Sequence, residues 1–181
     1  LAFNHHGKIK HNAPSLLNSE YNHLIMQDGK HLTLQEQALS VITNPEEMNC
    51  PESLILKRVL SCKTYKTILE DLSKLTPQAP APSIEHVLSA LTFYYSKFNA
   101  SKSDFDAAME LKLDLSIEAK RGFNLFMSKA QCATCHFLPL FNGVKPPFVG
   151  SEFEVLGVPD DTAFTIFGAD SGRYLINPSF E

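Results

Sequence analysis

Apolar residues recur three or four positions apart after residue 83, which predicts an amphipathic helix. The positions that form this stripe are Ile84, Val87, Leu88, Leu91, Tyr95 and Phe98. Ser83 stands where an N-cap belongs and Glu85 falls in the first turn, so we expect the helix to begin after Ser83 and to run to about Phe98. The stretch before it, LTPQAPAPS at 75–83, contains three prolines and is predicted to be a stiff connector.

A second helix is predicted to begin after Ser116, which is the expected N-cap residue. Its apolar face carries Phe123, Phe126, Met127 and Ala130. This helix leads directly to Cys132. A shorter helix is predicted to start near Pro51, and the sequence NASKSD separates the two long helices.

The remaining segments lack regular periodicity and are predicted to be loops. NAPSLLN and ITNPEEMN each contain a proline, and the segment after His136 is rich in Pro, Gly and Phe. Such a segment is better suited to surround a flat apolar ligand than to form a hydrophobic core of its own. We therefore expect a mainly α fold with long functional loops.

Composition narrows the class of protein. The 181 residues are 44% hydrophobic and 20% charged, which is ordinary for a globular chain. A net charge of −4 and a pI near 6.0 argue against a nucleic-acid-binding protein. No apolar run approaches the roughly 18 residues of a membrane span. The chain begins at Leu1 without Met, so we expect it to be an interior piece of a longer protein.

The four cysteines do not form a disulfide framework. Cys50 and Cys62 flank the short helix predicted from Pro51. That helix would hold their Cα atoms beyond the roughly 7 Å limit for a disulfide bridge. We therefore expect two free and largely buried thiols.

The sequence AQCATCHF, at 130–137, contains a CxxCH motif formed by Cys132, Cys135 and His136. A thioredoxin-type redox pair would follow a strand and begin a helix, whereas this motif follows a helix. A zinc site needs four ligands, and no second paired spacing supplies the others. The third chemistry is covalent attachment of haem c, in which two thiols add to the vinyl groups and the adjacent histidine binds the iron.

The surroundings of the motif favour haem c. Phe126, Leu138, Leu140 and Phe141 can line a porphyrin. A one-haem carrier is usually about half as long, with its motif near the N-terminus. About 130 residues precede Cys132 here, which predicts a further function.

Six ordered motifs resemble those of the bacterial di-haem cytochrome c peroxidase family. They cover essentially the whole chain and read HNAPSLLN, MQDGK, LTLQEQAL…ITNPEEM, LSIEAKRGFNLFMSKAQCATCHFLPLF, LGVPDD and DSGRY. The resemblance implies two cytochrome c-like helical domains, with 1–101 part of the N-terminal peroxidatic domain and 102–181 part of the C-terminal electron-accepting domain. It also implies two haem c groups in the intact protein, although this chain carries one attachment motif. The first CxxCH is expected before residue 1, and the distal ligand of the second haem after residue 181.

By this resemblance Glu47 falls on the family's peroxide-site glutamate and Gln37 on its glutamine. A carboxylate at the peroxide site can relay a proton between the two oxygens, and Gln37 can orient peroxide or water. Taken alone, Glu46 and Glu47 are typical of a solvated loop pair. Within the ordered motifs we expect Glu47 to be catalytic and Glu46 to face solvent. His136 becomes the ligand of the second, electron-accepting haem.

Four further residues are interpreted by the resemblance. Asn12 matches an asparagine that ligates an interdomain calcium, and its side-chain oxygen is a suitable hard ligand. His5 and His6 lie in a loop that provides a removable distal iron ligand in many members, although either could be a surface residue. Gln27 replaces the tryptophan between the haems. Because the chain contains no Trp, electrons must take another path.

The function that these assignments imply is reduction of hydrogen peroxide by a periplasmic peroxidase. Its electrons would come from a small donor cytochrome c or cupredoxin, and a homodimer is compatible with the family. One alternative is a related di-haem enzyme that oxidises side chains of a partner protein. The other is a one-haem electron-transfer module, which would have no need of Glu47 or Gln37.

Overall fold

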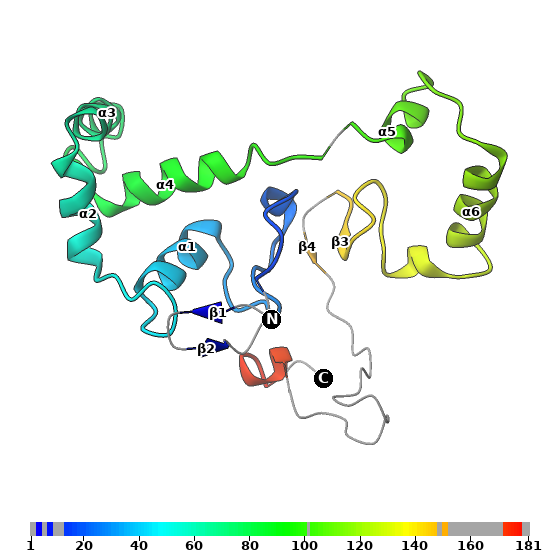
Figure 1. Cartoon of the computed structure of the whole chain (residues 1–181), viewed down its shortest axis with the longest axis horizontal. Helices are drawn as coiled ribbons and strands as arrows, with labels where there is room; N and C mark the ends of the chain where they lie inside the picture. The colour runs from blue at the N-terminus through cyan, green and yellow to red at the C-terminus, as the bar shows by residue number, and fades with distance from the viewer. Residues whose placement is uncertain are drawn as a thin grey trace. The chain divides into compact units, whose positions relative to one another are not determined.

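The structure is a computed structural model that describes residues 3–4, 7–8, 13–100, 102–147, 150–151 and 172–178 (Figure 1). The described part of the chain contains six α-helices, and its four strands are two residues long each. The mainly α fold expected from the sequence is confirmed. The chain divides into two compact units, one from Leu1–Ser15 with Leu24–Lys97 and the other from Leu16–His23 with Phe98–Glu181. The haem domains expected at 1–101 and 102–181 stay a prediction.

Four helices form the body of the first unit. They are α1 (Leu34–Thr43), α2 (Glu52–Ser61), α3 (Lys63–Lys74) and α4 (Ile84–Tyr95), preceded by an antiparallel pair of strands, β1 (Phe3–Asn4) and β2 (Gly7–Lys8). Helix α4 packs against α1, α2 and α3. Each helix contributes one buried apolar side chain to the core: Ala38, Ile55, Leu69 and Leu88. The core of this unit is therefore assembled around α4.

The connector predicted at 75–83 contains no helix or strand, and α4 begins directly after Ser83. His86 replaces the usual acidic partner of the capping residue. Its Nδ1 atom accepts a hydrogen bond from the Ser83 backbone N–H at 3.2 Å and lies 2.9 Å from the Ser83 hydroxyl. The helix ends at Tyr95, before the predicted Phe98. Just beyond the helix, the Phe98 carbonyl accepts a hydrogen bond from the N–H of Asn18 at 2.9 Å.

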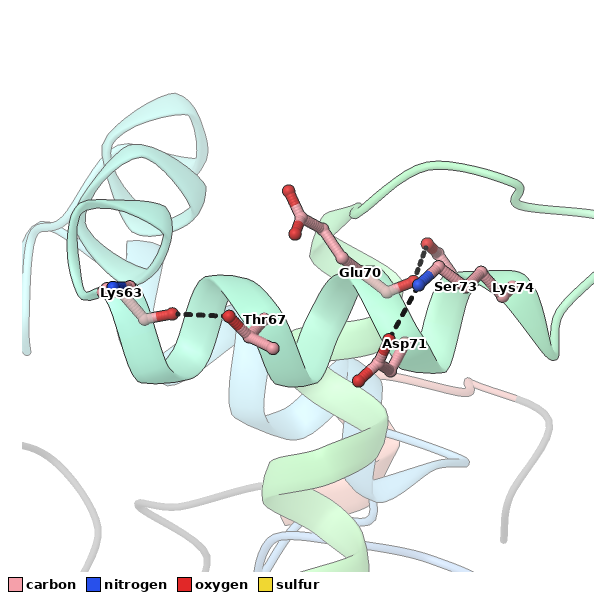
Figure 2. Close-up of polar contacts among 6 residues, drawn as sticks. All are labelled: Lys63, Thr67, Glu70, Asp71, Ser73 and Lys74. Atoms are coloured by element: carbon pink, nitrogen blue, oxygen red, sulfur yellow. Dashed lines mark hydrogen bonds and ion pairs between the residues drawn. The ribbon is translucent and has the colours of Figure 1, made fainter.

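Helices α1 and α3 were not singled out by the apolar pattern. Helix α1 begins with a capping box, in which the Thr33 hydroxyl accepts from the Glu36 N–H at 3.1 Å and Glu36 accepts from the Thr33 N–H at 3.3 Å. Figure 2 shows the local contacts of α3, where Lys74 contacts Asp71 at 2.8 Å. Polar side chains dominate α3, and Leu69 is its single buried apolar residue.

The second unit contains α5 (Asp104–Met109) and α6 (Ile117–Met127). Its shorter elements are η1 (Ser19–Tyr21), η2 (Cys132–Thr134), β3 (Val144–Lys145), β4 (Gly150–Ser151) and η3 (Gly172–Leu175). The segment around Asn18 joins this unit because the Asn18 side chain accepts a hydrogen bond from the Ala100 N–H at 3.1 Å. Helix α6 begins at its predicted cap, where the Ser116 hydroxyl accepts from the Ala119 N–H at 3.1 Å.

Helices α5 and α6 bury none of their residues. Several large apolar side chains near them are exposed, namely Met109, Leu111, Leu113, Ile117, Leu125 and Met127. The first unit also exposes large apolar side chains, but each of its four helices buries one apolar residue.

Cys50 and Cys62 are free thiols, as the sequence predicts, and no disulfide joins Cys132 to Cys135. Cys50 is half-buried, but Cys62 is exposed, so the expectation that both would be largely buried is wrong for Cys62. The reason is its position in the junction between α2 and α3. Cys62 is the C-cap of α2 and the N-cap of α3, and its side chain makes no capping hydrogen bond.

Candidate functional site

The CxxCH motif forms a single tight turn after α6. Cys132 begins the short helix η2, and its carbonyl accepts hydrogen bonds from the N–H groups of Cys135 at 3.3 Å and His136 at 2.9 Å. Gln131, just before the turn, has a left-handed backbone with φ 56°. The turn gathers two thiols and one imidazole in a segment of five residues. Cys132 is half-buried, and Cys135 and His136 are exposed.

The imidazole of His136 is held by the backbone of the following loop. Its Nδ1 atom lies 2.9 Å from the carbonyl oxygen of Phe141. A carbonyl oxygen can only accept a hydrogen bond, so Nδ1 carries the proton and donates it. The lone pair of the neutral ring is therefore on Nε2, which is the form that binds a metal.

The loop between the two residues is closed by its own backbone. Phe137 and Asn142 form an isolated bridge, in which the Phe137 N–H donates to the Asn142 carbonyl at 2.8 Å. Phe141 has a left-handed backbone with φ 54°. This conformation is uncommon in residues other than glycine. It turns the Phe141 carbonyl oxygen towards Nδ1 of His136.

An aromatic cluster supports this loop. The Phe141 ring lies edge-on to Phe105 and Phe126, with ring centroids 4.8 Å and 5.5 Å apart. Phe126 also lies 6.4 Å from the ring of His136, and Phe105 contacts Phe123 on α6. Of the porphyrin-lining residues expected from the sequence, Phe126 and Phe141 lie beside His136. Leu138 and Leu140 are half-buried in the same loop.

The donor set fits haem c. Two free thiols and an Nε2 lone pair lie on one turn, and exposed apolar side chains of α6 lie nearby. Cys132 and Cys135 would hold the porphyrin covalently, and His136 would bind the iron. Exposed apolar surface beside an imidazole lone pair suits a flat apolar group that carries a metal.

The second candidate site is the loop that follows α1. Asn44 ends the helix, and residues 45–48 form a turn. The Glu47 side chain is half-buried and its Oε2 atom accepts a hydrogen bond from Asn44 Nδ2 at 3.0 Å. Glu46 is exposed, and only its backbone N–H contacts Asn44. The two adjacent glutamates therefore have different surroundings.

Gln37 lies on α1 in the same unit as Glu47 and is half-buried. In the described part of the chain no hydrogen bond joins the two side chains. Gln27, which replaces the inter-haem tryptophan, is exposed in the turn between Ile25 and His31. Asn12, His5 and His6 lie outside the described residues.

Two properties of the described residues bear on metals and membranes. No group of three or more His, Cys, Asp or Glu side chains among them could hold a metal ion. No helix within the same ranges is both long and apolar enough to cross a bilayer.

A family model described as "Di-haem cytochrome c peroxidase" matches residues 2–113, well over half of the chain. The chain belongs to this family. The match includes Gln37 and Glu47 and ends before the CxxCH motif. The family resemblance inferred from the six motifs is confirmed.

Curated relatives agree with this membership of the di-haem cytochrome c peroxidase family. The methylamine utilization protein MauG of Methylorubrum extorquens is 31% identical over 68% of this chain and 34% of its own length. Cytochrome c551 peroxidase of Nitrosomonas europaea is 30% identical over 81% of this chain and 41% of its own. Cytochrome c peroxidase Ccp of Escherichia coli is 29% identical over 90% of this chain and 33% of its own. The chain thus spans between a third and about two-fifths of the length of these relatives.

The fold of this family member is also that of a solved protein. The crystal structure of a MauG-like protein associated with microbial copper homeostasis matches with a TM-score of 0.77. The match covers 98% of this chain and 54% of the other, at 19% identity.

Two features of the site were missed by sequence reasoning. One is Asn44, which the motif Asn-Pro-Glu-Glu-Met contains but which carries no chemistry of its own. The other is the Phe141 carbonyl, which no side-chain pattern could reveal. An asparagine before a proline does signal a turn, and that signal could have identified Asn44.

Proposed function

We propose that this chain is part of a di-haem cytochrome c peroxidase that reduces hydrogen peroxide to water, with Glu47 as the proton-transfer group. The observation that carries the proposal is the half-buried Glu47 carboxylate beside an exposed neighbour, Glu46. Its Oε2 atom is bound by Asn44, and its Oε1 atom has no hydrogen bond within the described residues. A carboxylate held in this way is suited to taking and returning a proton.

The chemistry requires such a group. Reduction of one peroxide molecule to two waters consumes two electrons and two protons. The haem of the peroxidatic domain, when bound, would supply the iron that binds peroxide, and the haem held by His136 would supply it with electrons. Glu47 would take a proton from one peroxide oxygen and return it to the other, so that the leaving oxygen departs as water. Gln37 would orient the peroxide or a water by hydrogen bonding, since an amide cannot relay protons well.

Electrons are proposed to enter at the haem attached by Cys132 and Cys135, with His136 as its ligand, and to pass from there to the peroxide-binding haem. Electrons would come from a small cytochrome c or cupredoxin. Covalent haem attachment normally takes place outside the cytoplasm, which supports a periplasmic location. A calcium ion bound by Asn12, a distal iron ligand at His5 or His6, and a homodimer are further family-level proposals for the intact protein.

A second enzymatic function is oxidation of side chains on a partner protein. Two of the relatives are named methylamine utilization protein MauG, and one of these is 31% identical to this chain. An electron-transfer module without enzymatic activity is less well supported, because a carrier needs no proton-transfer group such as Glu47. Assays with peroxide and a donor cytochrome, with and without a candidate protein substrate, would separate the two enzymes.

The decisive experiment is Glu47→Gln in the intact, haem-loaded protein. The substitution keeps the size of the side chain and its hydrogen bond with Asn44 but removes the proton-transfer group. We expect peroxide turnover to fall by roughly 100- to 10,000-fold, the range for general acid–base catalysis. Haem content and reduction of the second haem by the donor should be unchanged.

Glu46→Gln is the matched control. It removes the same negative charge one residue away, from a side chain that is exposed. It should alter turnover little. If both substitutions change peroxide turnover by equal and small amounts, Glu46 and Glu47 are a solvated acidic pair. That result would favour the electron-transfer module.

A further inference from the structure

Asn44 makes an unusual number of hydrogen bonds in the loop that carries Glu47. Its N–H ends α1 by donating to the Ser40 carbonyl at 2.9 Å. Its carbonyl accepts from the N–H groups of Glu47 at 3.0 Å and Asn49 at 2.9 Å, and its Oδ1 atom accepts from the Glu46 N–H at 3.0 Å. These bonds use every backbone polar group of Asn44 and one end of its side chain.

The other end of that side chain contacts the proposed proton-transfer group. Asn44 Nδ2 donates to Glu47 Oε2 at 3.0 Å, and both side chains are half-buried. The Asn44 amide is thus fixed at its oxygen by the backbone of Glu46 while its nitrogen holds the carboxylate. Asn44 therefore connects the end of α1, the backbone of the turn and the Glu47 carboxylate.

We propose that Asn44 is a positioning residue that orients the Glu47 carboxylate for proton transfer. This inference rests on the proposed function of Glu47, and it adds a role for the residue that binds the Glu47 carboxylate. Glutamate has three rotatable side-chain bonds, so an untethered carboxylate would sample several orientations. Holding a reacting group in one geometry is worth a large part of the rate, and a shift of about 1 Å can cost roughly 100-fold.

The chemistry of an amide suits this role. The Nδ2 group can only donate a hydrogen bond, and it does not titrate. It therefore binds Oε2 of Glu47, and the other carboxylate oxygen, Oε1, remains available to exchange the proton. A carboxylate in place of Asn44 would repel Glu47 or share its proton, and a lysine would bring a competing acid.

Asn44→Asp removes the hydrogen-bond donor and adds a negative charge beside Glu47. The introduced carboxylate keeps an oxygen to accept from the Glu46 N–H, and the backbone hydrogen bonds of residue 44 are unchanged. It cannot donate to Glu47 and places a second negative charge against Oε2. In the intact haem-loaded protein we expect kcat for peroxide to fall by roughly 10- to 100-fold while KM stays constant. The melting temperature should also fall.

The double variant Asn44→Asp with Glu47→Gln separates positioning from a general loss of structure. Here the amide introduced at position 47 can donate to the carboxylate introduced at position 44, so the hydrogen bond returns with its direction reversed. We expect the melting temperature to return to that of Glu47→Gln. The kcat should equal that of Glu47→Gln alone, because a residue that acts only through Glu47 has nothing left to position.

Each outcome decides the inference. Full activity of Asn44→Asp when Glu47→Gln is impaired would overturn the role of Asn44 and leave that of Glu47 standing. A double variant far less active than Glu47→Gln would assign Asn44 a structural role. Full activity of Glu47→Gln would refute the proposed function and the positioning role together.

If Asn44→Asp does not fold, Asn44→Ser replaces it. The shorter hydroxyl side chain can still accept from the Glu46 N–H in the turn but does not reach Glu47, and it adds no charge. The same loss of kcat at constant KM is expected. Unchanged kcat in Asn44→Ser would refute the role.

Discussion

The Nδ1 atom of His136 lies 2.9 Å from the carbonyl oxygen of Phe141, five residues further along the chain. This hydrogen bond fixes the tautomer of the imidazole and makes Nε2 a better electron donor to a metal. It depends on the left-handed backbone of Phe141, with φ 54°. The conformation of one loop residue therefore controls the electronic character of the proposed haem ligand.

Phe141→Ile should raise the reduction potential of the haem bound by His136. A β-branched residue is strained in the left-handed region, so the carbonyl should move away from Nδ1. A weaker hydrogen bond makes the imidazole a poorer donor and destabilises oxidised iron. Redox titration followed by absorbance measures the change. Phe141→Leu is the control, because Leu is an isomer of Ile without the Cβ branch. Equal potentials for the Leu and Ile variants would contradict the prediction.

Cys132 and Cys135 should both bind haem covalently. A denaturing gel stained for haem should remain positive after acid-acetone extraction of protein matured in an export-competent host. Each single Cys→Ser variant should keep one thioether bond and some stain, and the double variant should lose all of it. Cys62→Ser is the matched control, because Cys62 is a free and exposed thiol like Cys135. Complete extraction of haem from the unmodified protein would refute haem c attachment.

Ser116→Ala should destabilise the second unit by about 1 kcal/mol, the typical cost of losing a helix N-cap. The Ser116 hydroxyl accepts from the Ala119 N–H at 3.1 Å at the start of α6, the helix that leads to Cys132. Urea unfolding followed by circular dichroism gives the free energy. Ser116→Asp keeps an N-cap acceptor and should restore stability. An alanine variant as stable as the aspartate variant would show that the cap contributes nothing.

His31 should make the first unit less stable in mild acid. Burial lowers its pKa from the ordinary 6.5, and Lys30 lowers it further, against weaker opposing effects of Glu36 and Asp28. The unfolded chain therefore binds a proton more readily than the folded chain, and stability falls as the pH drops below about 6.5. His31→Gln should reduce the difference in melting temperature between pH 8 and pH 5. An equal difference in both proteins would refute this.

Local patterns predicted much of the helical structure. Ser83 and Ser116 mark the starts of α4 and α6, because capping hydrogen bonds form within a single turn: the Ser83 N–H donates to His86 Nδ1, and the Ser116 hydroxyl accepts from the Ala119 N–H. The prolines at 75–83 and the turn at 45–48 were also recognisable, since Pro restricts its own backbone and that of its neighbour. The hydrogen bond between Phe98 and Asn18 was not, because these two residues are far apart in the sequence.

The sequence by itself determined the chemistry that this protein can carry. Two thiols and an imidazole in CxxCH, and a glutamate in an ordered set of motifs, identify the family through residue type and spacing alone. Only the tertiary structure decided how those groups are held. The Phe141 carbonyl reaches His136 because a loop closes between Phe137 and Asn142, and Glu47 differs from Glu46 because Asn44 binds its carboxylate. Backbone carbonyls and side-chain directions have no signature in a sequence, because they result from how the loop folds back on itself.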